Sequence, residues 1–164
     1  MDAKPVRRRL PLALAIAAVV LVVDQGTKFW AEHALTGRDP VPVLGDLLRF
    51  RLLYNPGAAF SIGTGATWVF TIVAAVAAGW LLWYLVKPHP VSHVVAFSLL
   101  LGGAVTHLGD RLFRAPGFAR GHVVDFIDYN GWFVGNVADI ALVLGAVSAF
   151  LLAARQKDPA DARD

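Results

Sequence analysis

Acidic side chains stand at two places where the sequence is otherwise strongly apolar. Asp24 and Asp139 each lie inside a long apolar segment, and an ionisable group in such a segment is by default a candidate for function. A carboxylate there can take part directly in proton transfer, or it can form an ion pair. Lys28 follows Asp24 at the i+4 spacing with the acid first, which predicts an ion pair that fixes this segment.

Asn136 precedes Asp139 by three residues, so the two side chains are expected to share one face of a helix. Together they can serve a reaction. Alternatively, with the small residues Gly135, Ala138 and Gly145, they form only a close contact between helices.

Two other combinations of residues would allow different chemistry. Ser61 and Lys28 could act as a serine nucleophile and its base, but this needs a neutral lysine, and Asp24 one turn away holds the lysine charged. We therefore rank it below a site built on acids. His89 and His93 have the i, i+4 spacing of a metal-binding pair, but no third ligand is near them, so we expect no metal site.

The composition indicates an integral membrane protein. Hydrophobic residues make up 57% of the 164 residues and charged residues only 16%, against about 25% charged residues in a typical soluble protein. The absence of cysteine excludes disulfides, thiolate metal sites and a cysteine nucleophile. The net charge of +3 is best explained by membrane topology, because the basic residues lie mainly at segment ends and in loops, so we expect no nucleic-acid binding.

Four apolar segments approach or exceed the roughly 20 residues of helix that cross a membrane, and they are residues 10–30, 66–86, 91–109 and 132–154. Residues 87–90 contain two prolines and predict a tight hairpin. The arginines before the first segment resemble the start of a cleaved signal peptide, but no convincing cleavage site follows. The predicted fold is an all-α membrane protein, a single integral domain over residues 1–164 with four transmembrane helices.

Two long connections, residues 31–65 and 110–131, are expected on the side opposite the termini. Within the first, residues 41–54 alternate apolar and polar side chains and include Pro42 and Gly45, which predicts short strands and turns. Connections of this length are usually functional. We expect a small extracytoplasmic β/loop subdomain between the first two spans that covers the site from outside.

The distribution of charge predicts the orientation of the chain. Basic residues are densest near the termini and in the hairpin, so both termini are expected in the cytoplasm. Asp24 and Asp139 then lie about 9 and 10 Å inside the outer ends of their segments. The other polar residues expected at that face are Asn55, Ser61, Asp110 and Arg111. This one-sided distribution predicts a functional site at the outer leaflet.

Five short blocks follow one another along the chain: D-Q-G-T-K at residues 24–28, N-P-G-A-A-F-S at 55–61, G-G-A-V-T-H-L-G-D-R at 102–111, V-V-D-F at 123–126 and N-V-A-D at 136–139. In this order and topology the chain resembles bacterial lipoprotein signal peptidases, the signal peptidase II family of intramembrane aspartic proteases. Each block alone is a weak signal, but the resemblance extends over about residues 10–153.

The sequence departs from the family pattern at two places. Thr106 and His107 stand where the family usually has Gly-Asn, so an imidazole replaces an amide of the polar site network. Gly135 stands where a phenylalanine usually precedes the N-x-A-D block. The imidazole can donate a hydrogen bond as the amide does, and it can also titrate near neutral pH.

The resemblance implies a reaction and a catalytic pair. The family cuts prolipoproteins just before a diacylglyceryl-modified cysteine, without a metal or a cofactor. Its catalytic aspartates match Asp125 and Asp139, which would share one proton around an attacking water; Asp128 is the rival to Asp125. The residues expected to bind substrate or to support the site are Asn55, Gly57, Arg111, Asn136, Asp24, Lys28, Asp110 and His107.

The expected roles of these supporting residues differ. Arg111 is expected to hold the substrate or to pair with Asp110, and Asp24 with Lys28 to give structural support. The resemblance places the chain in the bacterial cytoplasmic (inner) membrane with its active site at the extracytoplasmic face. The expected partners are the prolipoprotein substrate and membrane lipids, and we expect a monomer.

A non-catalytic four-span transport or assembly protein is the alternative function. Such a protein should carry charges through the full membrane depth or an inverted repeat. The sequence has neither.

Overall fold

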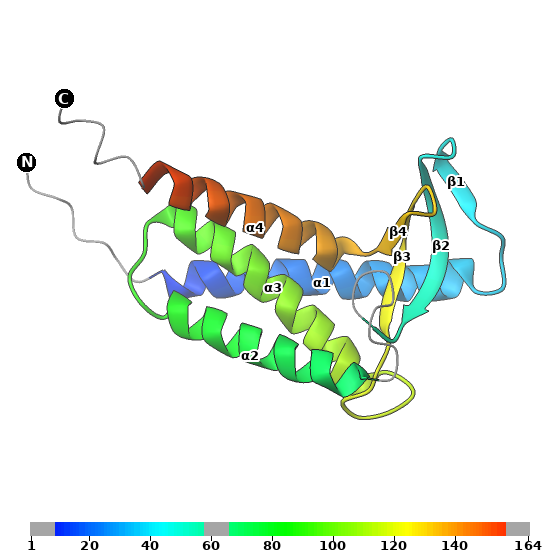
Figure 1. Ribbon diagram of the computed structural model, residues 1–164, viewed down its shortest axis with the longest axis horizontal. Helices are drawn as coiled ribbons and strands as arrows, with labels where there is room; N and C mark the ends of the chain where they lie inside the picture. Colours follow the sequence, from blue (N-terminus) through cyan, green and yellow to red (C-terminus); the bar gives the residue numbers. More distant parts are fainter. Residues whose placement is uncertain (1–8, 58–65, 157–164) are drawn as a thin grey trace, which may run out of the picture.

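A computed structural model describes residues 9–57 and 66–156. Four of its helices are long and apolar enough to cross a membrane: α1 (Leu10–Leu35), α2 (Thr67–Leu85), α3 (Val91–Phe113) and α4 (Val137–Gln156). They confirm the four spans expected from the sequence. The start of α1, the α2–α3 connection and the end of α4 lie at one end of the bundle (Figure 1).

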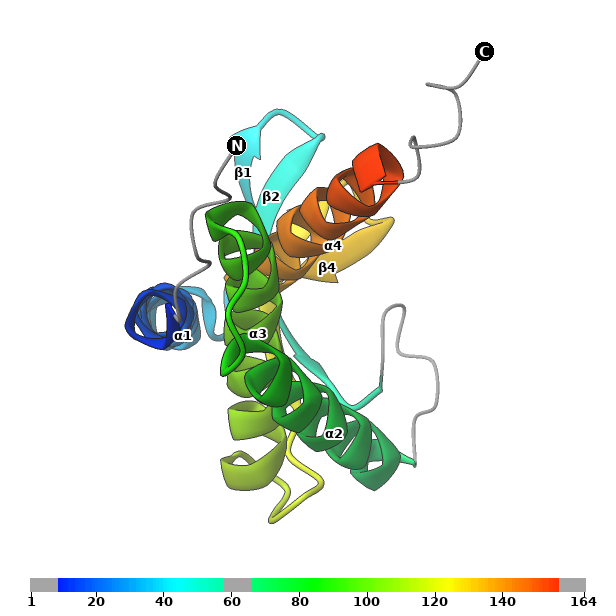
Figure 2. The same ribbon diagram turned by 90° about the vertical axis from the view of Figure 1, so that its left-hand side faces the viewer.

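Helix α3 lies in the middle of the bundle, with α1, α2 and α4 around it (Figure 2). Glycines on α3 explain how two of these neighbours come so close. A Cβ atom on Gly102 would lie 2.7 Å from Cβ of Val20 in α1, and one on Gly103 would lie 2.5 Å from Cγ of Leu142 in α4. Small residues are common at helix contacts within membranes for this reason.

An antiparallel sheet lies across the other end of the bundle (Figure 1). Its strands, in spatial order, are β1 (Val41–Leu44), β2 (Leu48–Asn55), β3 (Val123–Tyr129) and β4 (Phe133–Gly135). The first two confirm the strands predicted for the first long connection. The other two come from the second connection and from the expected start of the fourth span, so both connections build the subdomain.

The sheet is fastened to the last turns of α1. Ala31 and Leu35 of α1 form a buried apolar cluster with Phe126 and Ile127 of β3. This contact explains why α1 continues five residues beyond the predicted end at residue 30. Both faces of β3 are covered, since Val123 through Asp128 are all buried.

Two other span boundaries differ from the prediction. Helix α4 begins at Val137 rather than near Trp132, because Trp132 lies in the turn of residues 130–132 and β4 follows it. Asp139 therefore lies in the first turn of α4 instead of about 10 Å inside the outer end of a span. Helix α3 continues to Phe113, so Asp110 lies within the helix and not at its end.

The tight contact between α3 and α4 leads to a first prediction. Gly103→Ala should lower the free energy of unfolding by about 1–3 kcal/mol, as overpacking typically does. Gly109→Ala on the same helix is the matched control, because a Cβ there meets nothing within 4 Å and alanine is the better helix former. Thermal unfolding of both variants in detergent tests this, and equal melting temperatures would contradict the packing argument.

Candidate active site

Asn136 closes the beginning of α4 together with Asp139. The backbone N–H of Asp139 donates to Oδ1 of Asn136 at 3.1 Å, and the backbone N–H of Asn136 donates to Oδ2 of Asp139 at 2.9 Å. This reciprocal pair has the form of a capping box, which satisfies N–H groups that the first turn of a helix leaves unbonded. The i, i+3 spacing seen in the sequence thus serves the start of the helix and orients the carboxyl group.

The capping arrangement also connects α4 to the neighbouring strand. The side-chain amide of Asn136 donates to Oδ1 of Asp125 at 2.6 Å and to the carbonyl of Val124 at 3.3 Å. One side chain therefore contacts both Asp125 and Asp139, which the resemblance had paired.

Sheet register brings a second amide to Asp125. Asn55 on β2 lies opposite Val123 on β3, so it is a diagonal neighbour of Asp125 on the same face of the sheet. Its Nδ2 donates to Oδ2 of Asp125 at 3.0 Å. Both carboxyl oxygens of Asp125 therefore accept a hydrogen bond from an asparagine.

Asp125 is almost fully buried, with 2% of its surface exposed. Burial, and then the nearby carboxylate of Asp139, raise the pKa of Asp125 to about 6, although the two amide hydrogen bonds and the neighbouring His107 oppose the rise. Removal from water disfavours the charged form of an acid, and a second negative charge adds to this effect. A proton is thus held at this position at a higher pH than on an ordinary aspartate.

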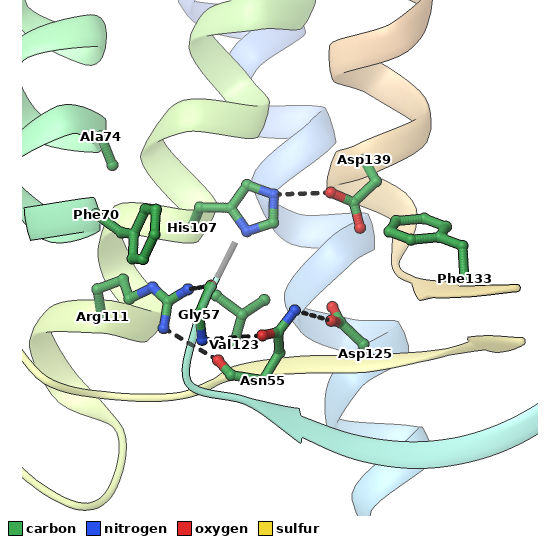
Figure 3. A pocket seen from close by; sticks show the side chains of 10 residues that line it. All are labelled: Asn55, Gly57, Phe70, Ala74, His107, Arg111, Val123, Asp125, Phe133 and Asp139. Atoms are coloured by element: carbon green, nitrogen blue, oxygen red, sulfur yellow. Dashed lines mark hydrogen bonds and ion pairs between the residues drawn. The ribbon is translucent and has the colours of Figure 1, made fainter. Parts of the chain in front are cut away.

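The carboxyl groups of Asp125 and Asp139 point toward each other into one cavity (Figure 3). The cavity has a volume of about 170 Å³, room for water and part of a larger molecule. The side chain of Asp139 is 29% exposed, and Nε2 of His107 lies 3.2 Å from its Oδ1. The cavity is lined by Asn55, Gly57, Phe70, Ala74, His107, Arg111, Val123, Asp125, Phe133 and Asp139.

Arg111 holds the chain segments that flank the cavity. Its buried guanidinium donates to the carbonyls of Asn55 and Gly121 at 3.0 and 3.1 Å, and also to the carbonyl of Gly57. It does not pair with Asp110, which was one of the two roles expected for it. Neighbouring residues on a helix point in different directions, and here Arg111 points to the cavity while Asp110 points to α1.

A buried ion cluster lies beside the cavity. The ammonium group of Lys28 is 2.6 Å from a carboxylate oxygen of Asp24 and 2.6 Å from one of Asp110. This confirms the predicted ion pair of Asp24 and Lys28 and adds a third member. A lysine between two carboxylates is not suited to act as a neutral base, which argues against the serine mechanism. Ser61, its expected nucleophile, lies outside the described residues.

Asp24 also connects α1 to the candidate site. Its Oδ1 accepts the backbone N–H of Ala138 in the first turn of α4 at 2.9 Å, and its Oδ2 accepts the hydroxyl of Thr106 on α3. The acid thus joins three helices at the level of the cavity. The expected structural role of Asp24 is consistent with these contacts.

Sequence reasoning did not single out three members of this network. Gln25 donates to Thr106 and to Asp110 at 2.9 Å each, and Arg114 bridges Asp110 and Glu32 at 2.7 Å each. Gln25 is a polar residue within an apolar segment, a signal that could have identified it. The pair of Arg114 and Glu32 is separated by 82 residues and becomes visible only in the fold.

Asp128, the rival to Asp125, does not line the cavity. Residues three apart on a strand point to opposite faces, and Asp128 lies 3.2 Å from Arg49 and 3.5 Å from Arg51. Its Oδ1 also accepts the backbone N–H of Gly131 at 2.6 Å in the turn before β4. These contacts give Asp128 a place in the sheet rather than in the cavity.

The histidines considered for a metal lie at the other end of the bundle. His89 stacks on Tyr84 with ring centroids 3.8 Å apart, and its Nε2 is 2.9 Å from the carbonyl of Tyr84. Over residues 9–57 and 66–156, histidines and acids form no group of three that could hold a metal ion.

The geometry is suited to acid–base chemistry on a water molecule. Two facing carboxyl groups share a proton when their charges repel each other. The ionised partner can then accept a proton from water while the protonated partner donates a hydrogen bond to a carbonyl group. This is the arrangement by which aspartic proteases hydrolyse peptide bonds.

Comparison with known proteins agrees with this chemistry. The family model for signal peptidase (SPase) II matches residues 16–155. The lipoprotein signal peptidase of Mycobacterium avium is 45% identical over 88% of this chain and 80% of the relative. For the lipoprotein signal peptidase of Mycolicibacterium smegmatis, the identity is 46% over 86% of this chain and 60% of the relative.

Two solved structures share the fold. One, described as a bacterial membrane enzyme solved by the in meso method at 2.3 Å resolution, matches with a TM-score of 0.78 and 28% identity over 92% of each chain. A second bacterial membrane enzyme, at 1.9 Å resolution, matches with a TM-score of 0.75 and 29% identity over 90% of this chain and 94% of that one. Since the family model also covers most of its length, this chain belongs to the signal peptidase II family.

Proposed function

We propose that Asp125 and Asp139 are the catalytic pair with which this signal peptidase hydrolyses the bond just before the diacylglyceryl-modified cysteine of a prolipoprotein. The observation that carries the proposal is the pair of carboxyl groups pointing into one cavity, one of them with a raised pKa (Figure 3). The charged side chains described inside the bundle gather at the sheet end, which does not favour the transport or assembly alternative.

The two aspartates take different parts in this mechanism. Asp139 lies in the first turn of α4, where the helix dipole favours a negative charge, so it accepts a proton from the attacking water. Asp125 keeps its proton and donates a hydrogen bond to the oxygen of the scissile carbonyl. When the tetrahedral intermediate collapses, the C–N bond breaks, and the amine of the cysteine takes up the proton that Asp139 received from the water, which restores both carboxyl groups.

The chain around the cavity supports an extended substrate. Arg111 fixes the carbonyls of Asn55, Gly57 and Gly121, which keeps the two sheet segments at a constant separation. Gly57 lines the cavity without a side chain, so a substrate backbone can approach it closely.

An apolar cavity beside the dyad fits the lipid of the substrate. It has a volume of about 320 Å³ and shares Phe133 and Asp139 with the first cavity. Its remaining lining residues are Tyr129, Ile140, Val143 and Leu144. We assign it to the acyl chains of the diacylglyceryl group, because these must stay in the bilayer while the peptide bond reaches the carboxyl groups.

The proposed orientation follows from the same geometry and from the charge pattern. We place both termini in the cytoplasm and the sheet with the dyad at the extracytoplasmic face of the bacterial membrane. The protein then acts as a monomer and a single membrane domain. Membrane lipids contact the exposed apolar side chains of the helices, which include Val19, Val22, Val76 and Val143.

Replacement of either catalytic aspartate should abolish cleavage without loss of the fold. Asp125→Asn and Asp139→Asn keep the size of the side chain but remove the proton transfer, so the rate should fall by about 10²-fold or more. Cleavage of a purified diacylglyceryl prolipoprotein in detergent measures this, with thermal unfolding as a check of folding. Asp128→Asn is the matched control on the same strand and should still cleave. If Asp128→Asn were inactive while Asp125→Asn cleaved, the catalytic residue would be Asp128 and not Asp125.

The pKa of Asp125 predicts the alkaline side of the pH profile. The raised value of about 6 means that the proton needed on Asp125 is lost as the pH rises through this region. For the free enzyme, kcat/KM should therefore decline above about pH 6, whereas kcat declines at a higher pH because bound substrate excludes water. Steady-state rates between pH 4.5 and 9 test this, and a flat kcat/KM over that range would refute the assignment of Asp125 as the acid.

A further inference from the structure

His107 contributes a third titratable side chain to the cavity. It lies on α3 with its side chain 19% exposed, and its Nε2 is 3.2 Å from Oδ1 of Asp139 on α4. Figure 3 shows the imidazole beside Asp139, above Asn55, which donates to Asp125. In the family that the sequence resembles, this position usually carries an amide, which cannot change its charge.

The contact between His107 and Asp139 is built into the helix packing. Gly103 precedes His107 by four residues on the same face of α3, and it allows α4 to approach to the point where a Cβ atom would meet Leu142 and the carbonyl of Ala138. Thr106, the adjacent departure from the family pattern, points instead to α1 and donates to Asp24. The two substitutions therefore serve different helices, and only His107 faces the cavity.

The cavity brings both acidic and basic side chains close to His107. Asp139 on α4 and Asp125 on β3 face it as acids, and Arg111, one turn further along α3, is the nearby base, held by backbone carbonyls. Helix α1 contributes Asp24, whose charge is paired with Lys28. From α2 the cavity receives Phe70 and Ala74, which do not titrate.

We propose that His107 is a positioning residue that fixes the orientation and the negative charge of Asp139, and that it extends activity to lower pH than an amide at this position would allow. This inference rests on the proposed function of the dyad. An imidazole gains its proton near neutral pH, and the imidazolium then attracts the carboxylate of Asp139. The imidazolium would thereby support the negative charge that Asp139 needs as the base of the reaction.

The first test is the pH profile of cleavage for wild type, His107→Asn and His107→Ala. His107→Asn keeps a hydrogen-bond donor but cannot carry charge, so it separates the effect of the charge from that of the hydrogen bond. The acidic limb of its profile should move upward by about one pH unit, the size of effect expected when a neighbouring opposite charge is lost. His107→Ala also loses the donor, and its kcat should fall by about 10-fold or more.

His33→Asn provides the matched control. His33 is exposed on α1 and packs against Phe29 with tilted rings, and it is not part of the cavity lining, so this variant should keep the profile of the wild type. If His107→Asn gives a profile that superimposes on the wild type, the charge of His107 has no role and the inference is wrong. If the wild type does not cleave at all, the proposed function fails first.

A second measurement does not depend on cleavage. The imidazole resonances of the five histidines can be followed by NMR against pH in detergent, and the signal that disappears in His107→Asn identifies His107. In Asp139→Asn, which is inactive by design, the titration midpoint of His107 should move to lower pH by about one unit, because the imidazolium loses its carboxylate partner. An unchanged midpoint would show that the two groups are not coupled.

Discussion

The relative placement of Asp125 and Asp139 depends on the side-chain amide of Asn136, which lies where β4 meets α4. Asn136 accepts the N–H of Asp139 with its oxygen and donates to Asp125 with its nitrogen. An amide can do both at once because it has an acceptor and a donor side at fixed angles. A carboxylate in its place would offer no donor to Asp125, and a hydroxyl would not span the two groups. The position of each acid is therefore defined relative to the other by a single planar group.

The ion cluster beside the cavity shows how these positions are held within an apolar bundle. Lys28, Asp24 and Asp110 are almost completely buried, and charges removed from water are stable only when they are paired and hydrogen-bonded. Such a cluster adds little net stability over an apolar core, but removal of one member leaves an uncompensated charge and is strongly destabilising. Its main effect here is to permit one relative placement of α1, α3 and α4.

Much of this arrangement could be predicted from the sequence because the signals are local. Apolar runs gave the four spans, alternation gave β1 and β2, and the i+4 spacing gave the ion pair of Asp24 and Lys28. The start of α4 was predicted too early, since Trp132 is apolar and continues the hydrophobic run, although its side chain is 80% exposed in the turn before β4.

Other features follow only from tertiary structure. The resemblance favoured Asp125 over Asp128, but the residues alone do not show which of them is turned to the bundle, because both faces of this strand are buried and no alternation marks them. The second partner of Lys28, Asp110, comes from a helix that begins more than sixty residues later in the chain. We expected Arg111 either to hold the substrate or to pair with Asp110. Its partners are instead backbone carbonyls, which a pattern of side chains does not reveal.

The attachment of the sheet to the end of α1 has a mechanical consequence. Asp139 belongs to the bundle and Asp125 to the sheet, but α1 contacts both parts, through Asp24 at the first turn of α4 and through Leu35 at β3. The contacts form a closed ring that runs from α4 through α1 and β3 and back through Asn136. In a closed ring no element can tilt by itself without straining a contact with its neighbour. The distance between the two carboxyl groups therefore depends on all of these contacts together. A change in the tilt of α1 would therefore be transmitted to the gap between these groups.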